Sequence, residues 1–368
     1  MRISKKFPLL CSMRRRKCSQ FALFIVAVLI GSIVTYIVLS RQSQLQISEV
    51  EVIDQACNND TGVCFEIVDR SLHPPSYEEG TDEIVQRTLD RVTKNGSRIP
   101  ESTAYLIPYR EFARFGNSDT RLWKGMILGA FLSRVINFKQ RRQHKKVLCI
   151  GLGGGTMISY LKTLIDGLEI TAVEASEDVA DMAEKWFDVR GIVVAVREGL
   201  EWLKTRNEND TKYDLVFIDA CTDDPVQQCP PIPLTHPSNI HFLMKRFRKD
   251  GRAAVIFNFV VVGDRFAILT KHLEHLLTVF SSCFTLTFIL DSNVVVVCTT
   301  HPMMFFDTKH PEDSLWDALM GMAELYDEAD DQYEYGQSFI REIAAHALIK
   351  GKLFSASKYL DETEPHHS

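Results

Sequence analysis

The chain has 368 residues, too many for one small core and about right for one large domain with appended segments. Charged residues make up 24% of it and the formal net charge is −6, so the composition is that of an ordinary globular protein and gives no sign of nucleic-acid binding. The nine cysteines form no paired CxxC pattern, and we predict no metal site.

The first forty residues predict a membrane anchor. Phe21–Leu39 is uncharged and almost wholly apolar, and a helix of that length spans about 28 Å, close to the thickness of the hydrocarbon core. A cleaved signal peptide would have a shorter apolar region followed by small residues, whereas Arg41-Gln-Ser-Gln follows here. Because most nearby basic residues precede the span, we expect a cytosolic tail at 1–20 and a type II protein whose main body is lumenal, in the endoplasmic reticulum or Golgi.

Two kinds of motif agree with a lumenal main body. Glycosylation sequons begin at Asn59, Asn95 and Asn209, although sequons also arise by chance. Cys57 and Cys64 lie close together after the anchor, and an oxidising lumen would allow them to pair. The alternative is two unpaired thiols in a loop.

Residues 40–121 are predicted to form a stem and a small N-terminal subdomain. We expect a hairpin of strands Glu49–Ile53 and Val63–Val68 around an Asn-Asp-Thr-Gly turn. The spacing of apolar residues predicts an amphipathic helix over Asp82–Thr93. Tyr105–Pro108 is expected to be a short extended segment.

Residues 122–302 alternate between strand and helix patterns, which is typical of an α/β, Rossmann-like doubly wound sheet. Parallel strands are expected at Val147–Ile150, Ile170–Val173, Ile192–Val196, Tyr213–Ile218 and Ala253–Phe257. Helices are expected at Trp123–Phe138, Thr156–Ile165, Glu177–Phe187, Glu201–Lys204, His241–Arg248 and Phe266–Phe280. A short turn joins Cys283–Leu290 to Val294–Thr299, so these two strands should be antiparallel and complete a seven-stranded sheet. In 303–368 we expect outer helices at Leu315–Glu328 and Phe339–Leu348, then a tail.

Four glycines follow the first strand of this domain, at Gly151, Gly153, Gly154 and Gly155. Glycines there allow a tight turn and let a ligand lie against bare backbone, while the next helix points free N–H groups at it. Glu174 ends the following strand, at about the ~20-residue spacing where a carboxylate accepts hydrogen bonds from ribose hydroxyls. The stretch predicts half of a nucleoside site; an ordinary strand–helix turn is the alternative.

More carboxylates follow the next strands. Glu198 is placed where it can accept a hydrogen bond from an adenine amino group, although alone it would be taken for a helix-capping acid. Asp219 ends the fourth strand and faces the same edge, where it can bind an amino group or take its proton. Asp223 and Asp224 lie on the same loop, and either hold a cationic substrate or form a solvated turn.

These motifs together resemble a known family. V-L-C-I-G-L-G-G-G, A-V-E-A-S, E-G-L and Y-D-L-V-F-I-D-A-C-T-D-D-P are similar to the motifs of spermidine-synthase-type class I S-adenosylmethionine methyltransferase domains. Cys229-Pro-Pro, the strand Val294–Cys298 and His301-Pro302 resemble the C-terminal domain of the elongation-factor-1-alpha lysine and N-terminal methyltransferases. The resemblance covers roughly Leu122 to Pro302.

The resemblance implies a cofactor, S-adenosylmethionine, and a role for each motif residue. Gly151, Gly153 and Gly155 would line the methionine moiety, Glu174 would hold the ribose, Glu198 the adenine, and Asp219 the reacting end. Relatives usually carry Asp where Glu198 stands. Polyamine synthases continue their loop with Gly-Pro-Ala and a Tyr, whereas Asp224-Pro225 is followed here by V-Q-Q-C-P-P, so aminopropyl transfer is the weaker prediction.

The sequence therefore predicts a membrane-anchored methyltransferase that acts on an amine, either on a protein or on a small molecule. One alternative is a spermidine-synthase-like aminopropyltransferase. The other is a catalytically inactive, membrane-tethered binding module that keeps the fold. Cys221 and Cys229 flank the loop after Asp219, and an oxidising lumen would allow them to pair as well.

Overall fold

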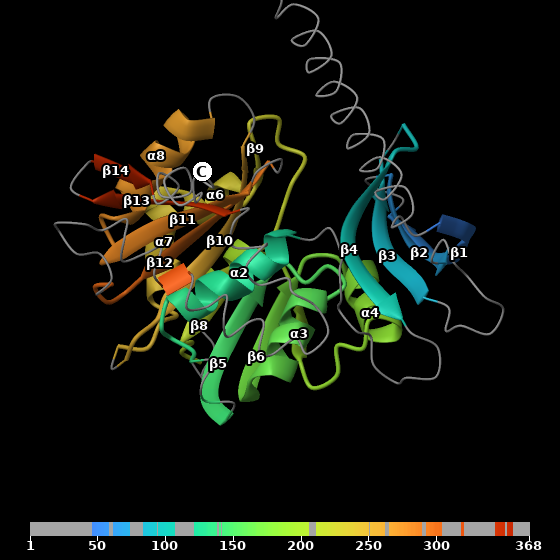
Figure 1. Ribbon diagram of the computed structural model, residues 1–368, viewed down its shortest axis with the longest axis horizontal. Helices are drawn as coiled ribbons and strands as arrows, with labels where there is room; N and C mark the ends of the chain where they lie inside the picture. The colour runs from blue at the N-terminus through green and yellow to red at the C-terminus, as the bar shows by residue number, and fades with distance from the viewer. Residues whose placement is uncertain are drawn as a thin grey trace, which may run out of the picture.

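The computed structural model describes residues 46–58, 62–73, 84–93, 95–106, 121–137, 140, 142–205, 211–249, 251–261, 265–288, 292–303, 318–319, 343–349 and 352–355. Two sheets stand side by side: a small N-terminal sheet and a large sheet flanked by helices (Figure 1). Within these ranges no helix is long and apolar enough to cross a membrane. The expected anchor at Phe21–Leu39 and the sequons at Asn59 and Asn209 lie outside the described residues.

The large sheet has ten strands, nine of them in the order β7-β6-β5-β8-β10-β12-β11-β13-β14, while β9 pairs with the end of β10. Neighbours from β7 to β10 are parallel, and β12 runs antiparallel to both β10 and β11. The strands are β5 (Arg142–Ile150), β6 (Asp166–Glu174), β7 (Val193–Val196), β8 (Leu215–Ile218), β9 (Gln227–Cys229), β10 (Ala254–Val261), β11 (Ser282–Phe288), β12 (Asn293–Thr299), β13 (Ile343–Ile349) and β14 (Lys352–Ser355). The mixed α/β sheet is confirmed, but it has ten strands, not seven, because β9, β13 and β14 extend the expected set.

Helices cover both faces of this sheet because its central strands are apolar on both sides. In β8, Leu215 and Phe217 belong to the core under α2 and α3, whereas Val216 and Ile218 belong to the core under α7 and α8. The helices are α2 (Arg121–Leu132), α3 (Thr156–Leu164), α4 (Glu177–Trp186), α5 (Gly199–Lys204), α6 (Ile232–Thr235), α7 (Pro237–Met244) and α8 (Arg265–Leu276). Helix α2 ends earlier than expected, and α7 begins earlier because Pro237 suits a first helical position.

The small sheet is an antiparallel meander of β1 (Gln46–Asn58), β2 (Val63–His73), β3 (Ile84–Val92) and β4 (Arg98–Leu106). The expected hairpin is confirmed in β1 and β2. The helix predicted over Asp82–Thr93 is wrong, since β3 pairs with β2 and β4 along its whole length. The local spacing of apolar residues suited a helix. Cross-strand pairs such as the ion pair between Arg87 and Asp69 stabilise the extended strand instead.

The helix predicted over Phe339–Leu348 is also wrong where the structure describes it. Strand β13 pairs with the edge strand β11, and its buried residues Ile343 and Ala345 alternate with the half-buried Ala344 and His346. The alanine-rich sequence favoured a helix, but an open sheet edge offers it a full set of backbone hydrogen bonds. Of the helix predicted over Leu315–Glu328, only 318–319 are described.

Three disulfides cross-link the described part of the chain. Cys57–Cys64 joins paired residues of β1 and β2, and Cys221–Cys229 closes the loop between β8 and the end of β9. Both pairings were raised by the sequence. The third, Cys283–Cys298, joins paired residues of β11 and β12 and was not expected.

Candidate active site

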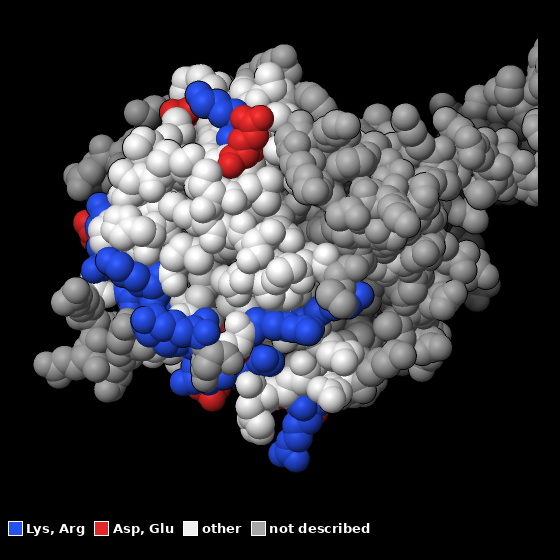
Figure 2. Space-filling view, turned by 90° about the vertical axis from the view of Figure 1, so that its left-hand side faces the viewer, with Lys and Arg blue, Asp and Glu red and all other residues white. Residues whose placement is uncertain are grey.

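A cavity of about 780 Å³ lies between the small sheet and the carboxyl ends of the parallel strands. This is the edge where ligands bind in doubly wound sheets. Its acids outnumber its bases: Asp90, Glu101, Glu174, Glu198, Asp219 and Asp223 line it with only Arg70, Arg91 and Arg98. By contrast, Figure 2 shows an outer face on which Lys and Arg predominate, most of them in its lower part. The acidic lining favours a cationic ligand.

The glycine loop forms the floor of the cavity and leads from β5 into α3. Gly151, Gly153 and Gly155 have φ of 91°, 52° and 69°, in the left-handed region that favours glycine. A Cβ at Gly151 would lie 2.7 Å from the backbone of Asp219, so no side chain fits there without movement. The expected tight turn is present, and it brings bare backbone against Asp219. Gly151 and Gly153 line the main cavity, whereas Gly155 lines a smaller cavity of about 70 Å³ beside it.

Glu174 lies at the end of β6, lines the cavity and also holds the glycine loop. Its Oε2 accepts hydrogen bonds from the N–H groups of Leu152 and Gly153, at 2.9 and 3.4 Å. Its Oε1 accepts one from the N–H of Ser176 at 3.0 Å. A carboxylate oxygen has two acceptor positions, so Oε1 retains one for a ligand hydroxyl.

Glu198 lines the same cavity, next to the N-terminus of α5. It occupies the N-cap position of that helix, yet its side chain makes no capping hydrogen bond. The helix-capping alternative therefore does not describe this side chain. Its exposed carboxylate does not cap the helix, so it can accept a hydrogen bond from a ligand.

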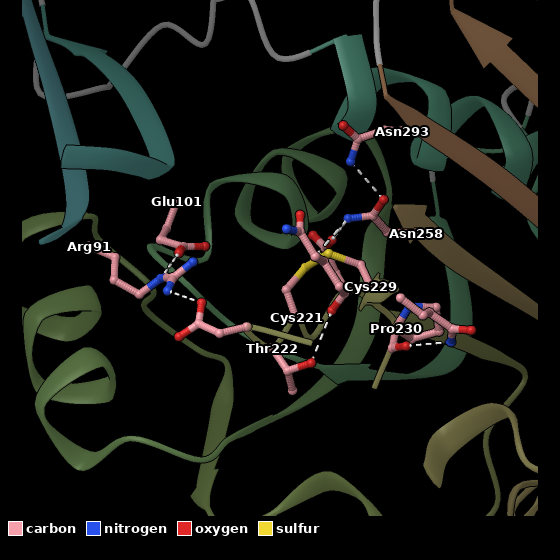
Figure 3. Close-up of a disulfide and its surroundings, with 12 residues drawn as sticks. Arg91, Glu101, Cys221, Thr222, Cys229, Pro230, Asn258 and Asn293 are labelled. Carbon is pink, nitrogen blue, oxygen red and sulfur yellow. Dashed lines mark hydrogen bonds and ion pairs between the residues drawn. A yellow bond between two sulfur atoms is a disulfide. The ribbon is translucent and has the colours of Figure 1, made fainter. Parts of the chain in front are cut away.

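Asp219 directly follows β8 and is half-buried. Burial raises the pKa of its carboxyl to about 7, a hydrogen bond from Asn258 opposes this rise, and the charge of Glu101 adds to it. The Nδ2 of Asn258, which is labelled in Figure 3, donates to Asp219 Oδ1 at 2.9 Å. A carboxyl group that titrates near neutral pH is suited to exchanging protons with a substrate.

The two acids of the following loop have different surroundings. Asp223 lines the cavity, and its Oδ1 lies 2.5 Å from Nη1 of Arg91 on β3, which is labelled in Figure 3. Asp224 accepts hydrogen bonds from the N–H groups of Val226 and Gln227, which lowers its pKa and stabilises the turn. It does not belong to the described cavity wall. The turn alternative thus describes Asp224, whereas Asp223 lies in the cavity wall and is paired with Arg91.

The small sheet contributes site residues that sequence reasoning missed. Ser102 Oγ accepts a hydrogen bond from the N–H of Gly154 at 2.8 Å, so β4 holds the glycine loop from above. Glu101 lies 2.7 Å from Nε of Arg91 and lines the cavity. These residues lie in what was predicted to be a stem, and no motif of their own identified them.

No protein-family model matches the chain, but sequence relatives do. It is 25% identical over 203 residues to the eEF1A lysine and N-terminal methyltransferase homolog of Drosophila melanogaster, covering 54% of this chain and 29% of that protein. It is 28% identical over 142 residues to the probable polyamine aminopropyl transferase of Bifidobacterium longum, covering 38% of this chain and 30% of that protein. The chain thus spans less than a third of the length of either relative.

A structural comparison finds human methyltransferase-like protein 13 in complex with SAH, with a TM-score of 0.47 and 20% identity, covering 55% of this chain and 90% of that one. The sequence relatives confirm the resemblance that the motifs predicted: the chain is similar to spermidine-synthase-like class I methyltransferases.

Proposed function

We propose that this protein is an S-adenosylmethionine-dependent methyltransferase that acts on an amine of a polypeptide. The observation that supports it most is one cavity lined by the glycine loop, Glu174, Glu198 and Asp219. The relatives named as lysine and N-terminal methyltransferases support an amine acceptor. The acidic lining agrees with them, because an amine is cationic before it reacts.

The residues present fit the cofactor. The left-handed glycines keep side chains off the floor, so the amino-acid end of S-adenosylmethionine would lie against backbone. The free acceptor position on Glu174 Oε1 suits a ribose hydroxyl, and Glu198 suits the adenine amino group. The cofactor would supply an activated methyl group on its sulfonium.

The contribution of the protein is to bind, orient and deprotonate. A protonated amine cannot act as a nucleophile, since its nitrogen electron pair is occupied. With a pKa of about 7, Asp219 can take that proton near neutral pH and leave the pair free. Asp223, fixed by Arg91, is placed to hold the cationic end of the acceptor before the proton leaves.

The test is labelled methyl transfer from S-adenosylmethionine to peptide amines, using the full-length protein in detergent. Asp219→Asn keeps the shape but removes the base, so turnover should fall by about 10²–10⁴, whereas cofactor affinity should change much less. Asp224→Asn is the matched control, because Asp224 stabilises only its own turn. Equal losses of binding and turnover would make Asp219 a cofactor ligand, and near-normal turnover would rule out its role as the base.

The likeness to a polyamine aminopropyl transferase favours a second candidate, aminopropyl transfer to a polyamine. The two functions need different cofactors, because aminopropyl transfer uses decarboxylated S-adenosylmethionine. Turnover with that cofactor and putrescine, and none with S-adenosylmethionine, would select the second candidate. If isothermal titration detects no binding of either cofactor, the protein is instead a binding module that keeps the fold.

We also propose that the domain is lumenal, behind an uncleaved anchor at Phe21–Leu39. Three disulfides support an oxidising compartment, since such bonds are rare in the cytosol. Asn95, the sequon in the described residues, is exposed in the turn between β3 and β4, where a glycan would have room. Endoglycosidase should reduce the apparent mass of the protein. An unchanged mass together with a protease-sensitive C-terminus in sealed microsomes would reverse the orientation.

A further inference from the structure

A side-chain amide on the neighbouring strand holds the carboxyl group of Asp219. Strands β8 and β10 are parallel and pair up to Ile218 and Phe257, so the next residues, Asp219 and Asn258, emerge side by side. Asn258 is 2% exposed, so water hardly competes with its hydrogen bond to Asp219 Oδ1. Among the described residues, no group donates a hydrogen bond to the second oxygen, Asp219 Oδ2. That oxygen can therefore accept one from a ligand in the cavity.

Asn293 fixes the direction in which the Asn258 amide points. It begins β12, and its Nδ2 donates to Asn258 Oδ1 at 2.8 Å (Figure 3). Since Oδ1 of Asn258 is engaged there, its Nδ2 must face Asp219. The same Nδ2 lies 3.9 Å from Cys221 Sγ, so the amide also touches the disulfide of the site loop.

We propose that Asn258, oriented by Asn293, is a positioning residue that holds Asp219 with Oδ1 engaged and Oδ2 presented to the acceptor. This rests on the proposed function, in which Asp219 Oδ2 receives a proton from the acceptor ammonium and the nitrogen electron pair becomes free. The donor stabilises the ionised carboxylate, because an N–H faces it. The acceptor therefore meets a base of fixed direction.

Among the groups that shift the pKa of Asp219, only Asn258 favours the ionised carboxylate. Glu101 on β4 raises the pKa of Asp219. Burial, and then the charges of Asp219 and Glu174, raise the pKa of the Cys149 thiol on β5. On the site loop, Asp223 is paired with Arg91. Removing the Asn258 donor should therefore raise the pKa of Asp219 further.

The test compares Asn258→Leu with Thr285→Val in the full-length protein. Thr285 is a buried residue of β11 whose Oγ1 donates to the carbonyl of His346 at 3.3 Å, so its loss costs stability without touching Asp219. In Asn258→Leu, the acidic limb of the kcat profile should move up by about one pH unit. Turnover at pH 7 should fall about fivefold and recover toward pH 9. Asn293→Ala should give a smaller shift in the same direction, and Thr285→Val none.

A second readout does not depend on turnover. The infrared carbonyl band of protonated Asp219, identified by its loss in Asp219→Asn, should persist to a pH about one unit higher in Asn258→Leu. An unchanged midpoint would overturn the proposal. If the band shifts as expected while the wild-type protein methylates no amine, the positioning role stands and the proposed function fails.

Discussion

Two carboxylates, at the ends of the strands β6 and β8 on either side of β5, are held in opposite ways. Glu174 accepts hydrogen bonds from three backbone N–H groups, which fix its position. Asp219 accepts one side-chain hydrogen bond and is otherwise desolvated, so its pKa rises to about 7. The same chemical group is therefore held by several hydrogen bonds at one strand and is mainly desolvated at the other.

The role of Glu174 predicts a loss of cofactor affinity on substitution. Glu174→Ala should weaken S-adenosylmethionine binding by about 2–4 kcal/mol, or roughly 30- to 1000-fold, because the ribose loses a charged partner and the loop loses its anchor. Isothermal titration measures the change. Glu169→Ala is the matched control, since Glu169 lies on the same strand with its side chain 64% exposed. An unaltered dissociation constant in a folded Glu174→Ala variant would refute the assignment.

Helices and strands can be predicted from the sequence where a local run of apolar residues determines their burial. The central strands β5, β8 and β10 contain the apolar runs Val147–Ile150, Leu215–Ile218 and Ala254–Phe257, and the glycine loop and Asp219 directly follow the first two. Strands β3 and β13 were predicted as helices because their extended form depends on partners elsewhere in the chain. The same reason hides Ser102 and Arg91, which reach the site only once the small sheet docks.

Docking of the small sheet predicts a role for Arg91 in acceptor binding. Arg91 bridges Glu101 of its own sheet and Asp223 of the site loop. Arg91→Ala should raise the acceptor KM by about two- to fivefold while leaving the Kd of S-adenosylmethionine nearly unchanged, because ion pairs open to water are worth about 1 kcal/mol or less. Steady-state kinetics separate the two. Arg190→Ala removes a surface ion pair outside the cavity wall and serves as control. An Arg91→Ala variant with a normal acceptor KM would count against this bridge.

Close packing of α2 on the sheet predicts a sensitive glycine. A Cβ at Gly129 would lie 2.7 Å from Cγ2 of Val297 on β12. Gly129→Ala should therefore lower the free energy of unfolding by about 1–3 kcal/mol, through overpacking, although alanine favours a helix. Gly251→Ala is the control, because nothing lies within 4 Å of its added Cβ. Denaturant unfolding measures both, and equal stabilities would show that α2 has room to shift.

For the whole molecule, the site depends on two parts of the chain being held together. One disulfide lies in the small sheet, one in the loop after β8 and one between β11 and β12, so each of these regions is cross-linked. Polar contacts join the small sheet to the helices of the large sheet, including the hydrogen bonds of Lys185 and Trp186 on α4 to Asp54 on β1. Burial in the wall of this cavity desolvates the carboxyl group of Asp219. Ionising that group therefore lowers the free energy of unfolding of the whole protein.

The raised pKa of Asp219 predicts how that cost varies with pH. The ordinary value is 3.8 and the folded value is about 7, so between these pH values the folded state binds a proton that the unfolded state releases. This contribution to the free energy of unfolding is therefore present at low pH and is lost as pH rises toward 7, by up to about 4 kcal/mol. Asp219→Asn removes the titration and should be more stable than the wild type at pH 8, but nearly equal to it at pH 4. Asp223→Asn, whose side chain is 74% exposed in the wild type, should show no such gain. Thermal unfolding at the two pH values measures the difference, and a stability gap that does not change with pH would mean that Asp219 is ionised without penalty.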